Sequence, residues 1–473
     1  MKRPNPLGRY AAFVFSVGGA RVGGVLITSL TFPYIVRHLG VEMYGLWSYV
    51  LAVCAFLNLV ANPGLVNYAT QQVAARRAAA FDLIPDVLLL RLLGALVAGV
   101  LLFVVASLET RPDVRQLFHF YGIGILIANL VSSDFLLTAL EMFHARSLLN
   151  LIQQSLYAIG IFTLVRSSKD VVWLPISILI SAFLTNLMGW VVLWARGFRM
   201  NWTIQPGRWK GILIPSSHYA VSSLMSSLYH RAGHILVRWL LGEHALGLYA
   251  AATRLVDILR HFVLIVVDVL MPRMALAATS EGGLGRLARF ALVIVAGVSI
   301  PLSVGLMCTA HLVVPWFLGA KYLEDVPLLR WMAFYIVTAS AASLLSGTIL
   351  YAMGRHRAYL ASTGGGAIAG MLLYLVLIPT MGLAGAGLAF ILAELFVALI
   401  AYVLLPRELR SLWRSPMVGY ISLSSIVMGF AVRTVNTYVS EPVIVIFVGA
   451  FVYLSLCYWF SRKWLIEQLT SVS

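Results

Sequence analysis

The sequence is dominated by long apolar segments that follow one another from one end of the chain to the other. A helix that crosses a membrane needs about 20 mostly apolar residues. Segments that meet this requirement lie at residues 11–36, 43–66, 87–107, 117–139, 147–165, 171–194, 212–240, 247–270, 288–314, 326–351, 359–378, 383–405, 416–436 and 442–460. The loops between them are short. We therefore predict an all-α polytopic membrane protein with about fourteen transmembrane helices.

The composition argues against a soluble protein. Hydrophobic residues make up 61% of the 473 positions and charged residues 11%, whereas a soluble domain is about half apolar and about a quarter charged. The net charge of +16 would suggest a nucleic-acid partner in a soluble protein. Here the basic residues lie in short loops between apolar segments. We therefore expect the lipid bilayer, and no nucleic acid, as the partner of this charge.

The distribution of Lys and Arg among the loops predicts the orientation of the chain. Cytoplasmic loops of membrane proteins are enriched in these two residues. With the N-terminus inside, the cytoplasmic segments hold about twenty Lys and Arg and the outer loops about eight. The alternation predicts an even number of spans and two cytoplasmic termini.

A short internal repeat predicts two similar halves. Residues 36–47 follow the first span and residues 237–249 follow the seventh, and both contain Val-Arg, a glycine turn, a Glu and then Gly-Leu-aromatic. Because six spans separate the copies, both enter the membrane in the same direction, as in a parallel repeat. We therefore predict a six-helix lobe at 1–200, a second six-helix lobe at 201–410, and two further helices with a cytoplasmic tail at 411–473.

Ionisable side chains within the predicted spans mark the candidate functional residues. Charges inside a membrane are costly and usually face the interior of a helix bundle or a wet cavity. In the seventh span Arg231, His234 and Arg238 share one face of a helix. Guanidinium groups match phosphate oxygens and stay charged at any relevant pH. We therefore predict an anion site in a translocation cavity, with the substrate-binding residues Arg21, Arg91, Arg231, His234, Arg254 and His261.

Acidic side chains in the spans are candidates for ion coupling. Titratable groups beside an anion site could link transport to a proton gradient. One face of the eighth span carries Arg254, Asp257, His261 and Asp268. The predicted ion-coupling residues are Asp134, Asp257, Asp268 and Glu394.

Structural roles compete with these assignments. Arg91 and Arg238 lie near span ends, from which long side chains can reach the headgroups. Arg254 and Asp257 are spaced as an i, i+3 ion pair, and Asp134 and Glu394 could be hydrogen-bonded struts between helices. Arg21 and Arg231 have no opposite charge three or four positions away. These two arginines are therefore the strongest candidates.

No pattern typical of an enzyme is present. The sequence has neither a nucleotide-binding P-loop nor a Cys/His metal spacing, and its three cysteines lie singly at unrelated spacings. We predict no catalytic residue, no metal and no cofactor.

Several motifs, taken in order along the chain, resemble those of a known family. They are residues 34–40 (Tyr-Ile-Val-Arg-His-Leu-Gly) with 44–47, 241–249 with 252 and 254–255, 315–319 (Pro-Trp-Phe-Leu-Gly) with Tyr322, 354–355, and 378–387. Together they resemble the Wzx-type polysaccharide flippases of the MOP exporter superfamily, which also contains MATE antiporters and lipid II flippases. The chain departs from the pattern where many relatives have acids, at residues 62–65 (Asn-Pro-Gly-Leu) and at Gly233-His234.

The resemblance implies a fold and a function. It implies two six-helix lobes around a V-shaped cavity, and alternating access that moves an undecaprenyl-diphosphate-linked oligosaccharide to the outer leaflet. It also implies that cationic cavity residues meet the diphosphate, and that a polysaccharide polymerase and its chain-length machinery are further partners.

Three other functions agree less well with the sequence. A MATE-like drug or cation antiporter would favour an acidic, aromatic cavity, whereas this chain has an excess of Arg and His in its spans. A membrane-embedded glycan polymerase or ligase would need a sizeable outer loop. A major-facilitator transporter would carry a Gly-x-x-x-Asp-Arg turn, which is absent from residues 68–77.

Overall fold

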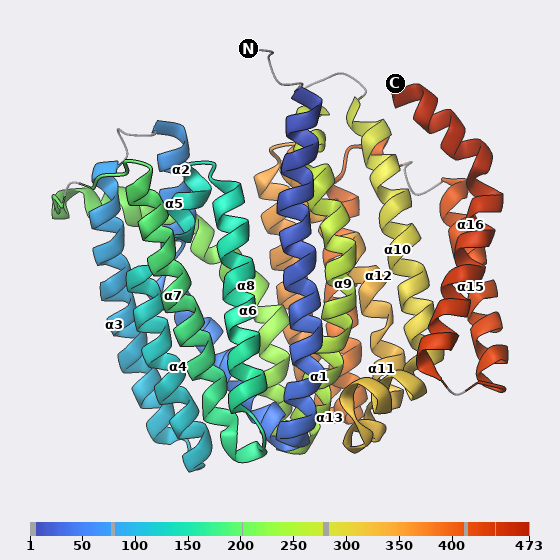
Figure 1. Ribbon diagram of the computed structural model, residues 1–473, viewed down its shortest axis with the longest axis horizontal. Helices are drawn as coiled ribbons and strands as arrows, with labels where there is room; N and C mark the ends of the chain where they lie inside the picture. Colours follow the sequence, from blue (N-terminus) through green and yellow to red (C-terminus); the bar gives the residue numbers. More distant parts are fainter. Residues whose placement is uncertain are drawn as a thin grey trace. The chain divides into compact units, whose positions relative to one another are not determined.

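The computed structural model describes residues 6–76, 81–200, 202–277, 283–410, 415–439 and 441–472. Its described elements are all helical, with no strand among them, which confirms the predicted fold class. Contacts divide the chain into two compact units, Met1–Arg238 and Trp239–Ser473. Each unit is described by itself below, and in Figure 1 unit 1 runs from blue to green and unit 2 from yellow-green to red.

Unit 1 is a bundle of long helices joined by short loops. Its elements are α1 (Pro6–Ala61), α2 (Leu65–Arg76), α3 (Ile84–Leu108), α4 (Pro112–Val131), α5 (Asp134–Ala139), α6 (Phe143–Leu164), the 3₁₀ turns η2 (Ser168–Val172) and η3 (Pro206–Arg208), α7 (Trp173–Ala195) and α8 (Trp209–Leu241), whose last residues pass into unit 2. Helix α4 packs against α3 and α7, and α6 packs against α1 and α7. These helices run side by side (Figure 1).

Unit 2 is also a helical bundle. Its elements are α9 (Glu243–Ala277), α10 (Gly283–Val313), the π-helical segment η4 (Val314–Leu318), the 3₁₀ segment η5 (Ala320–Asp325), α11 (Val326–Met332), α12 (Phe334–Ala342), the π-helical segment η6 (Ser343–Leu350), α13 (His356–Leu404), α14 (Arg407–Arg410), α15 (Pro416–Asn436) and α16 (Pro442–Val472). Helix α10 packs against α9, α12 and α15, and α15 packs against α16.

Proline marks the start of several of these helices. Helices α4, α15 and α16 begin at Pro112, Pro416 and Pro442, and α3 has Pro85 in its first turn. Proline is favoured there because the first N–H groups of a helix have no intrahelical partner and its fixed φ suits the helix. The same prolines end the polar loops in the sequence, so the predicted segments begin close to the observed helices.

The described residues contain eight helices that are long and apolar enough to cross a membrane, and nine if the bent pair Ala320–Met332 and Phe334–Leu350 is one span. This shows a multi-pass membrane protein. Two of the eight, α1 and α13, each contain two predicted segments. Helices α4, α8 and α9 do not qualify, and α8 and α9 carry many of the ionisable residues discussed above. The number fourteen and the orientation stay predictions.

The two glycines of the internal repeat have the same local role. Gly40 interrupts α1 with φ 76° and ψ 176°, and Gly242 separates α8 from α9 with φ 89°. Both values lie where a side chain is strained and glycine is not. In each copy the helix therefore ends, turns sharply and begins again, as the shared sequence predicts.

The predicted segment at 117–139 is wrong in one respect, because it is not one continuous helix. Helix α4 ends at Val131, and the short α5 begins at Asp134. Asn186 of α7 holds the break: its Oδ1 accepts from the backbone N–H of Ser133 at 2.9 Å, and its carbonyl oxygen accepts from the Ser133 hydroxyl at 3.1 Å. These contacts replace the intrahelical hydrogen bonds that a continuous helix would have made.

Candidate functional site

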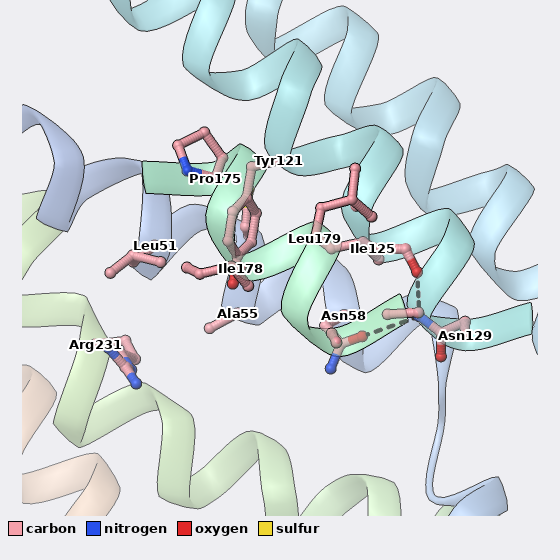
Figure 2. Close-up of a pocket in the computed structure, with 14 residues that line it drawn as sticks. Leu51, Ala55, Asn58, Tyr121, Ile125, Asn129, Pro175, Ile178, Leu179 and Arg231 are labelled. Carbon is pink, nitrogen blue, oxygen red and sulfur yellow. Dashed lines mark hydrogen bonds between the residues drawn. The ribbon is translucent and has the colours of Figure 1, made fainter. Parts of the chain in front are cut away.

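Unit 1 contains a cavity of about 330 Å³ between four of its helices (Figure 2). Its lining residues are Leu51, Cys54, Ala55 and Asn58 of α1, Tyr121, Gly124, Ile125, Ala128 and Asn129 of α4, Pro175, Ile178, Leu179 and Ala182 of α7, and Arg231 of α8. Most of these residues are apolar, and none of them is a carboxylate. The cavity is therefore an apolar chamber whose one formal charge is positive.

Arg231 supplies that charge. Its side chain is exposed rather than packed against neighbours. Within the described residues it has neither a hydrogen bond nor an ion pair. The guanidinium therefore keeps its donors available to a molecule inside the cavity. Its role in binding an anion stays a prediction.

Arg91 stands behind the same cavity. Its side chain is only 3% exposed, so it does not extend to the headgroups as the competing interpretation suggested. One terminal nitrogen donates to Oδ1 of Asn129 at 3.2 Å, and the guanidinium lies 5.8 Å from the centre of the Phe135 ring. Asn129 in turn donates to Oδ1 of Asn58 at 3.3 Å. A second arginine is thus connected to the cavity through two amide side chains.

The two other predicted residues of α8 have different surroundings. His234 is buried. Arg238 forms a paired ion bridge with Glu109, the residue after α3, with N–O distances of 2.7 and 2.9 Å. Its guanidinium also lies 4.1 Å from the centre of the Tyr49 ring. We call these three residues, Tyr49, Glu109 and Arg238, the clamp. Arg238 is thus engaged by protein groups, and this contact favours a structural role.

In unit 2 the predicted stripe of α9 does not form the expected pair. Arg254 is exposed, and Asp257 interacts with Arg260 at 3.8 Å instead. The Tyr335 hydroxyl donates to Asp257 at 3.0 Å. His261 is exposed, and one of its ring nitrogens lies 2.6 Å from the backbone oxygen of Asp257. Asp257 is thus held in a network, and Arg254 is not part of it.

Arg260 extends this network to neighbouring helices. It donates to the hydroxyl groups of Tyr335 at 3.2 Å and Ser343 at 3.0 Å. Tyr335 is stacked on Phe390 of α13, with ring centres 4.2 Å apart. Glu394, one turn further along α13, is 2% exposed. Of the predicted ion-coupling residues in unit 2, Asp257 is thus a half-buried member of this network, and Glu394 is a buried carboxyl group.

The remaining predicted residues are placed as follows. Asp134 accepts two hydrogen bonds from Arg146, at 2.8 and 3.0 Å, and both side chains are partly exposed. This geometry favours a structural role for Asp134. The side chains of Arg21 and Asp268 lie outside the part of the chain that the structure describes. Among the described residues, no group of three or more His, Cys, Asp or Glu could hold a metal ion.

A model of the polysaccharide biosynthesis protein family matches residues 12–277, which is more than half of the chain. This chain belongs to the polysaccharide biosynthesis protein family. A comparison with curated proteins found no significant match.

Solved structures show which fold this polysaccharide biosynthesis protein shares. The lipid II flippase MurJ in an inward closed conformation matches 96% of this chain and 100% of its own, with a TM-score of 0.75 and 16% identity. An inward-facing multidrug resistance MATE transporter of the MOP superfamily matches 83% of this chain and 99% of its own, with a TM-score of 0.61 and 16% identity. A MOP superfamily transporter from Pyrococcus furiosus matches 85% and 96%, with a TM-score of 0.52 and 14% identity. This chain therefore has the fold of MurJ and the MATE transporters.

Several polar residues of the cavity and of the clamp are not among the site residues predicted from the sequence. Asn58, Tyr121 and Asn129 line the cavity but carry no charge, so a search for intramembrane charges passed over them. Glu109 lies between the predicted spans 87–107 and 117–139, and nothing in the nearby sequence marks Arg238 as its partner. A search for all polar side chains at helical spacing would have found Asn58 and Asn129, because amides inside membrane helices usually bond across helices.

Proposed function

We propose that this protein moves lipid-linked oligosaccharides, carried on undecaprenyl diphosphate, from the inner to the outer leaflet of the cytoplasmic membrane. The observation that carries the proposal is the cavity of unit 1, in whose described lining Arg231 is the one charged residue. A cavity that is apolar, positive and free of carboxylates suits an anionic group better than a cation. Membership of the polysaccharide biosynthesis family and the fold shared with a lipid II flippase support this assignment.

The chemistry of a diphosphate explains why such a cavity is needed. A charged group in the hydrocarbon core of a bilayer is costly unless it is paired. Arg231 can form two parallel hydrogen bonds to phosphate oxygens, and a guanidinium keeps its charge throughout the transport cycle. Ligand pockets span roughly 300–1,000 Å³, so a cavity of about 330 Å³ suits the diphosphate and its immediate neighbours rather than a whole oligosaccharide.

The same proposal includes the predicted lobes, the orientation of the termini, the ion-coupling residues and the partner protein. The lobes would be residues 1–200 and 201–410, with two further helices at 411–473 and both termini in the cytoplasm. Asp257 and Glu394 of unit 2 are the proposed ion-coupling residues. The polymerase that receives the exported unit would be the functional partner of the flippase. The proposal is for transport rather than catalysis.

A MATE-like antiporter remains the second candidate, because MATE transporters share the fold. Cationic cargo would call for carboxylates around the cargo, and the described lining of this cavity has none. A glycan polymerase or ligase is less favoured still, because transport proteins are the ones that share this fold.

The test is complementation of a flippase-deleted strain of the source organism. Wild type, Arg231→Ala, Arg231→Lys and Arg21→Ala would be scored for surface glycan and for lipid-linked intermediate on the cytoplasmic face. We expect both alanine variants to lose surface glycan and accumulate intermediate at normal protein levels, and Arg231→Lys to retain part of the export. Arg208→Ala, at an exposed arginine of η3 outside the cavity, is the matched control. Failure of wild type to restore the glycan would reject the proposal.

A further inference from the structure

The side-chain amides of Asn58 and Asn129, which line the cavity, are each held in one orientation by their hydrogen bonds. An amide side chain can usually be placed in either of two orientations, but two neighbours of Asn129 settle the choice. Arg91 has donors and no acceptor, so the atom that faces it at 3.2 Å must be the Asn129 oxygen. The other end of the amide lies 2.9 Å from the carbonyl oxygen of Ile125, which can only accept. Both constraints require the Asn129 nitrogen to point away from Arg91.

The orientation of the Asn129 amide in turn fixes the orientation of the Asn58 amide. The Asn129 nitrogen donates to Asn58 at 3.3 Å, so the Asn58 oxygen must face it. The Asn58 nitrogen then points away from Asn129, as Figure 2 shows. Asn58 is exposed and lines the cavity, and within the described residues its nitrogen has no hydrogen-bond acceptor. The cavity therefore receives two N–H donors from Asn58.

Arg91 adds a charge that the surrounding protein does not balance. Its Nε and one terminal nitrogen are buried and have no hydrogen-bond partner among the described residues. A buried cation with unsatisfied donors is unfavourable unless a compensating group is present. A chain of hydrogen bonds also polarises its members, so the Asn58 donors are stronger than those of an isolated amide.

We propose that the Asn58 side-chain nitrogen and Arg231 form a two-point donor site for the phosphate oxygens of the transported molecule, and that Arg91 is the positioning residue that sets the direction of the amides. The proposal deepens the proposed function, because it names the group by which the substrate is held. The same oxygens occur in a lipid diphosphate headgroup and in free pyrophosphate.

Binding is measured with the purified full-length chain in lipid nanodiscs. One arm uses undecaprenyl diphosphate in the nanodisc, and the other uses inorganic pyrophosphate in solution. Asn58→Asp replaces the donor with a carboxylate oxygen of the same shape, and Asn58→Ala removes it. We expect a loss of about tenfold in affinity for Asn58→Ala, which is typical of a lost hydrogen bond to a charged group, and a larger loss for Asn58→Asp. Asn150→Asp, at an exposed position of α6 outside the lining, adds the same charge and should bind like wild type.

The direction of the amides has its own test. Arg91→Lys keeps a side chain that only donates, whereas Arg91→Gln introduces an acceptor and leaves the Ile125 carbonyl as the one remaining constraint on the Asn129 amide. We expect Arg91→Lys to restore most of the affinity that Arg91→Gln loses, at equal thermal stability of the two variants. Equal binding by both variants would overturn the role of Arg91.

The outcomes of these experiments test the phosphate-binding site independently of the proposed flippase function. Binding in both arms that depends on Asn58 supports the site for phosphate oxygens in general, and binding in the lipid arm alone supports it for the headgroup. Unchanged affinity of both Asn58 variants would overturn the site, even if wild type complements the deleted strain. Asn58-dependent binding by a chain that does not complement supports the site and rejects the flippase assignment.

Discussion

At the scale of single residues, the clamp contains a largely buried ion pair between Glu109 and Arg238. Glu109 and Arg238 are separated by 129 positions, and their side chains are 9% and 11% exposed. Arg238 lies two helical turns beyond Arg231 on α8, about 10 Å at 1.5 Å per residue. The paired hydrogen bonds to Arg238 hold the pKa of Glu109 below its ordinary value of 4.5. Glu109 is therefore charged at every physiological pH.

Neutralising Glu109 should destabilise the protein at neutral pH. Removing one member of such a pair leaves the other charge poorly compensated, so we expect Glu109→Gln to cost roughly 2 kcal/mol. Since the folded-state pKa of Glu109 is depressed, its contribution is fully present above the ordinary pKa and is lost as the pH falls through the folded-state value. Thermal unfolding in detergent should show a difference between wild type and Glu109→Gln at pH 7 that shrinks below pH 4.5.

A control for this measurement is Glu441→Gln, at an exposed glutamate just before α16. Its unfolding midpoint should follow wild type at every pH. A difference for Glu109→Gln that stayed constant down to the lowest pH would show that the clamp is not stabilised by the carboxylate charge.

At the scale of elements, the two repeat turns connect long helices through single glycines. Gly40 has a φ of 76° and a ψ of 176°, a region occupied essentially by glycine alone. A Cβ built on Gly40 meets no atom within 4 Å. The requirement for glycine is therefore one of backbone conformation and not of space.

Gly40→Ala should therefore measure the backbone strain of the turn in isolation. We expect the free energy of unfolding to fall by about 1–3 kcal/mol, the usual cost of holding a non-glycine residue in such a conformation. Gly419→Ala, at a helical position of α15 that also has open space around it, should be neutral or slightly stabilising. Thermal unfolding of the two variants side by side checks the expectation, and equal midpoints would mean that the turn relaxes without strain.

At the scale of the whole molecule, the even number of spans is the prediction that organises all others. With two cytoplasmic termini, a green fluorescent protein fused after residue 473 should be fluorescent, because it folds in the cytoplasm. Alkaline phosphatase fused after residue 110 should be active, because that position is predicted to lie outside, and the same enzyme fused after residue 204 should be inactive. An active phosphatase at the C-terminus would mean an odd number of spans and would reverse the predicted direction of the later helices.

Much of the fold could be predicted from the sequence because the signals are local. Each apolar segment has to satisfy its own backbone hydrogen bonds in lipid, which favours helix within the segment itself. The turns at Gly40 and Gly242 are likewise read from a few adjacent residues. The placement of Arg231 beside a cavity follows from the cost of an unpaired charge inside a membrane.

Tertiary structure decided which polar groups meet. The break before α5 depends on Asn186 of α7, and the partner of Arg238 lies on a loop 129 positions away. Arg91 is connected to the cavity only because α3 and α4 pack together and bring Asn129 to it. Spacing along one helix shows which residues share a face, but it does not show what packs against that face. The sequence by itself therefore determined the helices, their turns and the excess of cations, whereas helix packing alone determined which of those cations are held by the protein and which remain available to a substrate.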